Sequence, residues 1–344
     1  MRSIRKKIKS LTRVYQSEDS RRSAPTRLTR DAVRWAYRLF LDREPENEQV
    51  VDDHLLRCST TQDLRGNFIF SREFETKNPM FQSPVLFGDD PPMSIEAVTA
   101  EDDLQRLFDH IKSAWQELGK TEPYWSVVIS DKYRQENIQA NEDEFYRTGD
   151  QHVIQLFGSL ERNNVVYRDF KTCLDYGCGV GRISRHLAAR FEKVLAYDIS
   201  VPHLQLAEEH LSKERISNVT LRQIKSVRDL EHLPKVDVAY SIIVLQHNPP
   251  PVISFIIGGL IKALNPGGIA FFQVPTYRQG YEFSLAKYLS NNATKQGIEM
   301  HVLPQREIFE IAQRAGGRVL EVVNDGWTGN RERAVSNIFV IQKR

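Results

Sequence analysis

The chain has 344 residues, of which 40% are hydrophobic and 27% charged, and its formal net charge is +2. This composition is typical of a globular protein with one large domain and a smaller one. We expect no membrane span, because no apolar run reaches about 18 residues. The basic start lacks an apolar core and a cleavage site, which favours a cytoplasmic protein, and the spacing of the three cysteines predicts neither a disulfide framework nor a metal site.

Residues 1–27 are predicted to form a basic, flexible tail. Residues 1–30 carry ten lysines and arginines against Glu18 and Asp19, an excess of eight positive charges, so the remaining chain has a net charge of −6. Such a tail suits an anionic membrane surface or another polyanion, which would place the protein at the inner face of the membrane. The alternative is a solvated tail without a partner. We expect no sequence-specific contact with nucleic acid.

Residues 28–78 are predicted to form a small helical domain. Apolar residues recur at helical spacing from Val33 to Leu41, and Pro45 ends that helix. Residues 37–45 (YRLFLDREP) and 71–74 (SREF) resemble a bacterial helical domain of unknown function, with the pattern Y-R-x-x-L-x-R-x-P and the ending S-x-E-F. The resemblance implies an association with glycan-modifying enzymes. A helical extension without such a role is the alternative.

The next two segments differ in composition. Residues 79–100 are rich in proline and aspartate and are predicted to form a linker. Residues 101–165 are predicted to be helical, since Leu104, Leu107, Phe108 and Ile111 fall on one helical face. The aromatic residues of this segment either line a ligand cavity or belong to the core, and the sequence leaves both interpretations open; they include Tyr124, Trp125, Phe145 and Tyr146.

Residues 172–185 (TCLDYGCGVGRISR) predict a strand, a glycine-rich turn and the start of a helix. The turn has an acid, Asp175, followed by Gly177, Gly179 and Gly181 at alternate positions. It fails the dinucleotide fingerprint, because Arg182 stands where the third glycine would be. The pattern acid-x-Gly-x-Gly-x-Gly resembles motif I of the class I S-adenosylmethionine-dependent methyltransferases. In that family the loop backbone holds the methionine part of the cofactor, S-adenosyl-L-methionine.

From residue 170 onward, predicted strands alternate with predicted helices, which indicates a parallel sheet with crossover helices. Strands are expected near 172–175, 193–198, 219–224, 236–242 and 268–274, and two more at 318–323 and 337–341. The last two resemble the antiparallel end of the methyltransferase sheet. The resemblance implies an α/β, Rossmann-like, mostly parallel seven-stranded sheet with helices on both faces over residues 166–344, and a helical cap formed by residues 101–165.

The remaining cofactor contacts are predicted from strand ends, because ligands bind at the carboxyl edge of such sheets. Asp198 ends the second strand and is expected to bind the ribose hydroxyls, with an ordinary helix N-cap as the alternative. Ser226 is expected near the adenine and Ser241 near the sulfonium. Many relatives have an acid near the position of Ser226, so adenine recognition is left to other groups.

Candidate catalytic residues follow the later strands. His247 lies in the run 244–250 (VLQHNPP), where small-molecule methyltransferases often carry V-L-H-H, and a neutral imidazole is a suitable base near pH 7. Glu299 and His301 place polar side chains in a largely apolar run, which predicts acceptor or base residues. For all three residues the alternative is a hydrogen-bond network that orders the loop.

These patterns together predict an enzyme, an S-adenosylmethionine-dependent methyltransferase. With the helical domain, the resemblance suggests that the acceptor is a sugar of a bacterial surface glycan or of its precursor, and hence a role in polysaccharide biosynthesis. Two alternatives remain. The enzyme would act on a protein or a small metabolite, or the chain would be a non-catalytic glycan-binding module with a methyltransferase-like fold.

Overall fold

A computed structural model describes residues 28–69, 71–77, 90–291, 298–325, 327 and 334–344 of the chain. The predicted tail, residues 1–27, lies outside the described residues, as does the first half of the predicted linker, residues 79–89. The chain divides into two compact units, residues 1–83 and 84–344. The division falls within the range 79–100 that the sequence predicts as a linker, and each unit is described by itself.

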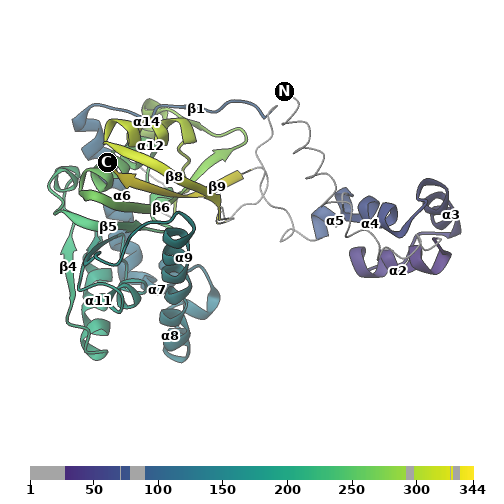
Figure 1. The fold of residues 1–344 in the computed structure, drawn as a ribbon, viewed down its shortest axis with the longest axis horizontal. Helices are drawn as coiled ribbons and strands as arrows, with labels where there is room; N and C mark the ends of the chain where they lie inside the picture. The colour runs from purple at the N-terminus through teal and green to yellow at the C-terminus, as the bar shows by residue number, and fades with distance from the viewer. Residues whose placement is uncertain (1–27, 70, 78–89, 292–297, 326, 328–333) are drawn as a thin grey trace, which may run out of the picture. The chain divides into compact units, whose positions relative to one another are not determined.

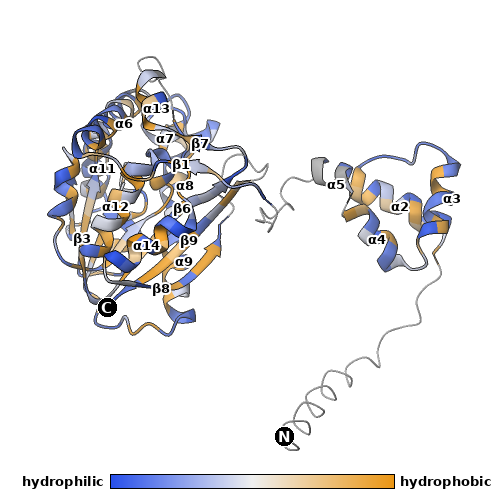
Figure 2. Cartoon of the chain, turned by 90° about the horizontal axis from the view of Figure 1, so that it is seen from above, coloured by the Kyte–Doolittle hydropathy of each residue, from blue (hydrophilic) through white to orange (hydrophobic). Residues whose placement is uncertain are grey.

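The smaller unit is a group of short amphipathic helices: α2 (Arg30–Leu41), α3 (Glu48–Arg57), α4 (Thr61–Ile69) and α5 (Arg72–Lys77). Thr29 caps α2 and Asn47 caps α3, each through a side-chain oxygen that accepts a backbone N–H. Both hydrophobic and hydrophilic residues occur on these helices in Figure 2. The apolar residues gather in one core that includes Val33, Tyr37, Val51, Leu64 and Phe68.

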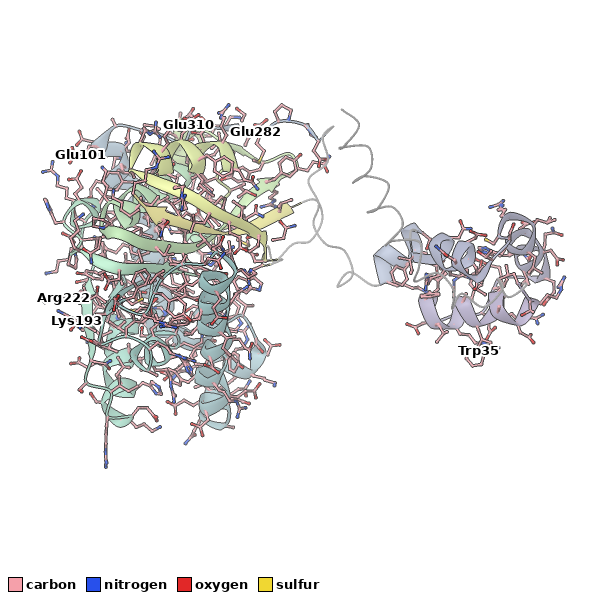
Figure 3. All side chains as sticks on the ribbon, in the orientation of Figure 1. Trp35, Glu101, Lys193, Arg222, Glu282 and Glu310 are labelled. Carbon is pink, nitrogen blue, oxygen red and sulfur yellow. The ribbon has the colours of Figure 1, made fainter. Side chains whose placement is uncertain are left out.

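The motif residues of this unit are joined by an ion pair. The Arg43 guanidinium donates through Nε and Nη2 to the two carboxylate oxygens of Glu73, both at 2.6 Å. The hydrogen bonds from Arg43 lower the pKa of Glu73 to about 2. Ser71 begins the last helix, since its Oγ accepts the N–H of Phe74 at 3.1 Å. The Arg43–Glu73 ion pair therefore joins the two parts of the motif, 37–45 and 71–74. Trp35 projects outward from α2 and is 55% exposed (Figure 3).

The larger unit is built on a seven-stranded sheet. Its strands are β2 (Thr172–Tyr176), β3 (Lys193–Asp198), β4 (Val219–Gln223), β5 (Val236–Ser241), β6 (Leu264–Arg278), β8 (Gly317–Asn324) and β9 (Ala334–Lys343). They lie in the order β4-β3-β2-β5-β6-β9-β8. β9 is antiparallel to both of its neighbours, and the other neighbouring pairs are parallel. The predicted mostly parallel sheet with an antiparallel end is confirmed.

Helices cover both faces of the sheet (Figure 1). One face packs against α6 (Glu101–Thr121), α12 (Pro250–Lys262) and α14 (Gln305–Arg314), and the other against α9 (Gly149–Arg162) and α10 (Ser184–Ala188). The remaining helices are α7 (Pro123–Val127), α8 (Ile138–Arg147), α11 (Val201–Lys213) and α13 (Leu285–Asn291), with single 3₁₀ turns η3 (Asp131–Tyr133), η4 (Val227–Glu231) and η5 (Leu245–His247). The predicted Rossmann-like α/β fold is therefore present.

The end of the predicted linker packs on the larger unit. The short strand β1 (Ser94–Ile95) pairs in parallel with β7 (Glu282–Phe283). The Tyr277 hydroxyl donates to the carbonyl of Pro91 at 3.0 Å, and the N–H of Leu285 donates to Glu96 at 2.7 Å. Within the described part of the chain, no helix has the length and apolar character to cross a membrane.

Candidate active site

The order of the strands reverses between β2 and β5, and ligands bind at such a switch point. Directly after β2, the backbone takes positive φ at Gly177 (76°), Gly179 (54°) and Gly181 (80°). The N–H groups of Gly177 and Cys178 donate to the carbonyl of Tyr197 at 2.7 and 3.0 Å, which ties the loop to β3. The loop thus needs glycine for its backbone conformation.

Space also requires glycine in this loop. A Cβ on Gly177 would lie 2.4 Å from the methyl groups of Val244, and one on Gly179 would lie 3.0 Å from Val127. The loop therefore packs closely against Val244 and Val127 only because side chains are absent, and its exposed backbone suits the methionine part of S-adenosylmethionine.

Asp198 joins this loop to the end of β3. One carboxylate oxygen accepts the N–H of Gly179 and the other accepts the N–H of Ser200, each at 2.8 Å. The residue also lines the pocket beside the loop. A carboxylate has about four acceptor positions, so two bonds to the backbone leave capacity for the two ribose hydroxyls. Ribose binding by Asp198 stays a prediction, and the geometry fits it.

Asp175 lies at the base of the same pocket and is 2% exposed. The hydroxyl of Ser184 donates to it at 2.6 Å. Burial raises the pKa of this carboxyl to about 6. Asp175 therefore anchors the start of α10 beneath the loop.

The pocket at the switch point is lined by four strand ends and by helices of the cap. Its wall combines the glycine loop and Asp198 with apolar residues, among them Ile199, Ile224, Ile242 and Trp115. Two predicted residues are not among the lining residues. The Ser226 hydroxyl accepts the N–H of Arg228 at 3.0 Å as a cap of η4, and the Ser241 hydroxyl donates to the carbonyl of Tyr176 at 3.0 Å.

A second cavity adjoins the first. The two share five lining residues: Ser126, Val127, Arg182, Ile243 and His247. The second cavity adds apolar side chains such as Ile129, Ile298 and Met300, the indole rings of Trp125 and Trp327, and the polar residues Thr148, His152 and Gln246. Of the aromatic residues in the helical segment, Trp125 lines this cavity, whereas Phe145 and Tyr146 are fully buried in a core cluster.

His247 lies at the boundary of the two cavities. Its Nδ1 is 2.8 Å from the carbonyl oxygen of Glu299, which can only accept, so Nδ1 carries the proton. Its Nε2 then accepts from the amide of Gln246 at 3.2 Å. Burial lowers the pKa of His247 to about 4. The imidazole is therefore neutral near pH 7, and Nε2 is its basic nitrogen.

Glu299 and His301 line neither cavity. The Glu299 carboxylate accepts from the Tyr288 hydroxyl and lies against His301 Nε2, each at 2.8 Å. Tyr281 reaches the other ring nitrogen of His301 at 2.7 Å. Alternate residues of this segment, Ile298 and Met300, line the second cavity. The contacts of both residues agree with the alternative interpretation, a network that orders the loop, and Glu299 reaches the site through its backbone carbonyl.

Several polar or aromatic residues that line the two cavities are missing from the sequence predictions, among them Trp115, His152 and Arg182. Trp115 lies 5.4 Å from the His247 ring, centroid to centroid. His152 lies against Trp327 at a centroid distance of 5.0 Å. Arg182 borders both cavities, and its one sequence signal is its place directly after the last glycine. No group of His, Cys, Asp and Glu that could hold a metal ion occurs among the residues described.

Comparison with known proteins agrees with this geometry. Residues 173–268 match the family model described as a methyltransferase domain. A ubiquinone biosynthesis O-methyltransferase of Acinetobacter baylyi is 33% identical over 104 residues, which cover 30% of this chain and 42% of that protein. A protein of the same name from Hydrogenovibrio crunogenus is 28% identical over 176 residues, covering 46% of this chain and 71% of that protein. The chain thus spans less than half of the first curated relatives that it matches.

Among solved structures, magnesium protoporphyrin IX methyltransferase from Synechocystis with bound SAH has a TM-score of 0.48 and 20% identity, covering 69% of this chain and 100% of that chain. The family match runs from β2 to the first residues of β6, and it includes the glycine loop, Asp198 and His247. This segment therefore matches a methyltransferase domain, and the pocket at its switch point is the candidate cofactor site.

Proposed function

We propose that the protein transfers the methyl group of S-adenosylmethionine to a hydroxyl group of an acceptor in the second cavity. The observation that carries the proposal is that the two cavities adjoin. The cavity beside the glycine loop shares Arg182, Ile243 and His247 with a cavity that has an apolar and aromatic wall. A methyl donor and its acceptor need this arrangement, because the reaction is an in-line displacement between neighbouring molecules.

Specific residues would hold the cofactor. The loop of Gly177 and Gly179 would receive the methionine part and Asp198 the ribose, while Ile199 and Ile224 would offer apolar contacts to the adenine. When bound, S-adenosylmethionine supplies an electrophilic methyl group on a sulfonium. The chain's own residues then exclude water and hold the acceptor hydroxyl in line with that methyl group.

An oxygen acceptor has to lose its proton, and His247 is the candidate base. The carbonyl of Glu299 fixes its Nδ1 proton, so Nε2 is the nitrogen that can accept a proton. An acceptor hydroxyl that replaces the Gln246 amide as the donor to Nε2 would be placed between the two cavities. A pKa of about 4 keeps this nitrogen free near neutral pH but makes it a weak base.

For the acceptor, we propose a sugar of a surface glycan or of its precursor. Support comes from Trp125 and Trp327 in the lining of the second cavity, since aromatic side chains pack against the apolar parts of a ligand, and from the motif of the smaller unit. A hydroxylated small metabolite is the second candidate. It is favoured by the apolar residues Ile129, Ile298 and Met300, and by similarity to ubiquinone biosynthesis O-methyltransferases.

The test has two steps on the full chain. Calorimetric titration with S-adenosylhomocysteine first measures cofactor binding. Labelled methyl transfer from S-adenosylmethionine into fractionated lysate of cells lacking the protein then identifies the acceptor class. Label in polysaccharide or lipid-linked glycan supports the sugar acceptor, and label in small metabolites supports the second candidate. Failure to bind the cofactor overturns the methyltransferase proposal and leaves a non-catalytic binding module.

A further inference from the structure

Arg182 is a buried cation beside the cavity proposed for the acceptor. It follows Gly181, is 3% exposed and lines both cavities. Its Nη1 donates to the hydroxyl of Thr148 at 3.2 Å, whereas its Nε has no hydrogen-bond partner. Among the residues that the structure describes, no carboxylate forms an ion pair with it.

This arrangement leaves a charge without compensation. A buried cation without a paired anion loses several kcal/mol of hydration that neutral hydrogen bonds do not restore. Asp175 is the acidic residue that acts on Arg182, but its hydrogen-bond partner is the hydroxyl of Ser184. Burial raises the pKa of that carboxyl to about 6, so Asp175 is mostly ionised near pH 7, but among the described residues no hydrogen bond joins it to the guanidinium. The guanidinium therefore has an N–H donor, at Nε, that is available to bind a ligand.

The guanidinium faces the acceptor side. Its partner Thr148 lines the second cavity and is not among the residues lining the first. His152 also lines the second cavity. Its pKa is lowered to about 4, mainly by burial and to a smaller extent by the positive charge of Arg182. His152 is thus neutral near pH 7, so Arg182 supplies the positive charge of this part of the wall.

We infer that the acceptor carries an oxyanion, a carboxylate or phosphate group, that pairs with the Arg182 guanidinium. The inference rests on the proposed function and specifies its substrate class as an acidic sugar or another acidic hydroxyl compound. A guanidinium presents parallel N–H donors that match both oxyanions. The pair would orient the acceptor so that its hydroxyl meets His247 at the boundary of the two cavities.

The experiment follows the His152 ring by NMR in the full chain saturated with S-adenosylhomocysteine. Acetate and inorganic phosphate are titrated separately at constant ionic strength, against chloride. We expect a saturable shift of the His152 signal with at least one of these anions, and the responding anion identifies the source. Arg182→Gln should abolish the shift while the affinity for S-adenosylhomocysteine stays within about twofold.

A matched control and a second variant keep the test decisive. Arg185→Gln removes another partly buried arginine, which contacts His210 and Glu214 and lines neither cavity, so the shift should remain. If Arg182→Gln does not fold, Thr148→Val removes the hydroxyl that holds the guanidinium and should weaken the anion response.

Three results overturn the inference: no saturable response to either anion, an unchanged response in the Arg182 variant, or a tenfold or greater loss of S-adenosylhomocysteine affinity in that variant. The last result would assign Arg182 to the carboxylate of the cofactor. Failure of the wild-type chain to bind S-adenosylhomocysteine would instead contradict the proposed function, which keeps the two failures distinct.

Discussion

The pocket proposed for the cofactor and the cavity proposed for the acceptor are built from different kinds of groups. The cofactor pocket depends on backbone: three glycines with positive φ, and Asp198, which accepts two backbone N–H groups. The acceptor cavity depends on side chains from distant segments, including Trp125, Arg182 and Trp327. A binding site made of backbone groups suits one fixed ligand. A cavity lined by side chains can instead change its specificity by substitution without disturbing the sheet. Substitutions on the two sides should therefore have different effects.

The largest effect is expected from Gly177→Ala. The new methyl group would lie 2.4 Å from Val244 on a backbone with φ of 76°, which costs about 1–3 kcal/mol in strain alone. Affinity for S-adenosylhomocysteine, measured by calorimetry, should fall about 100-fold. Gly267→Ala is the control, since φ there is 80° but nothing lies within 4 Å of the added Cβ. Equal losses in both variants would contradict a backbone-built cofactor pocket.

The next largest effect is expected from Asp198→Asn. Replacing one carboxylate oxygen by an NH₂ group removes an acceptor for a backbone N–H and for the ribose. Hydrogen bonds to charged groups are worth about 1.5–3 kcal/mol, so affinity for S-adenosylhomocysteine should fall at least tenfold. Asp237→Asn is the control, because Asp237 also accepts two backbone N–H groups, at Lys171 and Thr172, but lines neither cavity. Unchanged affinity in the Asp198 variant would remove it from the ribose site.

On the acceptor side, His247→Gln should lower turnover about tenfold with little change in cofactor affinity. The factor lies below the usual range for a general base, because a pKa of about 4 is poorly matched to neutral pH. Turnover is measured once the acceptor class is known. His210→Gln is the control, since His210 stacks on Tyr146 and also has a pKa of about 4 but lines neither cavity. Wild-type turnover in the His247 variant would exclude it as the base.

Acid should affect stability with opposite signs at two kinds of buried group. Burial lowers the pKa of His210 to about 4, so between pH 6.5 and 4 the unfolded chain binds more protons at this residue than the folded chain. The free energy of unfolding therefore decreases as the pH falls through this range. Burial raises the pKa of Asp325 to about 6, so the folded chain binds the extra proton and stability rises as pH falls.

These signs are tested by urea unfolding at pH 7 and pH 5. His210→Gln should reduce the loss of stability between the two pH values, by on the order of 1 kcal/mol after allowance for solvent around the ring. Asp325→Asn should increase that loss. Changes of the same sign in the two variants would contradict the assignment.

The smallest effect is expected in the other unit. Arg43→Gln removes the ion pair with Glu73, whose side chains are 27% and 35% exposed. Because solvent screens such a pair, the unit should lose no more than about 1 kcal/mol of stability. Thermal unfolding measures this change, and calorimetry should find unchanged affinity for S-adenosylhomocysteine. A loss of cofactor affinity would show that the two units are coupled.

Prediction from sequence succeeded where the signal is local. The expected strand at 193–198 is observed with the same bounds, and the strand expected near 219–224 ends one residue earlier. These elements follow from apolar periodicity and from glycines and prolines at their ends. The predicted roles of Ser226 and Ser241 came from strand ends alone. Strand ends do not determine which side chains line a pocket, and neither hydroxyl does so here.

The sequence by itself determined the α/β fold, the glycine loop and the position of Asp198, because each depends on residues close together in the chain. Tertiary structure alone decided the acceptor side. It placed Trp327 against His152, turned Glu299 away from the cavity and left Arg182 without an acidic partner among the described residues. These relationships join segments separated by tens to more than a hundred residues, and packing selects them through distances and burial that no local spacing encodes.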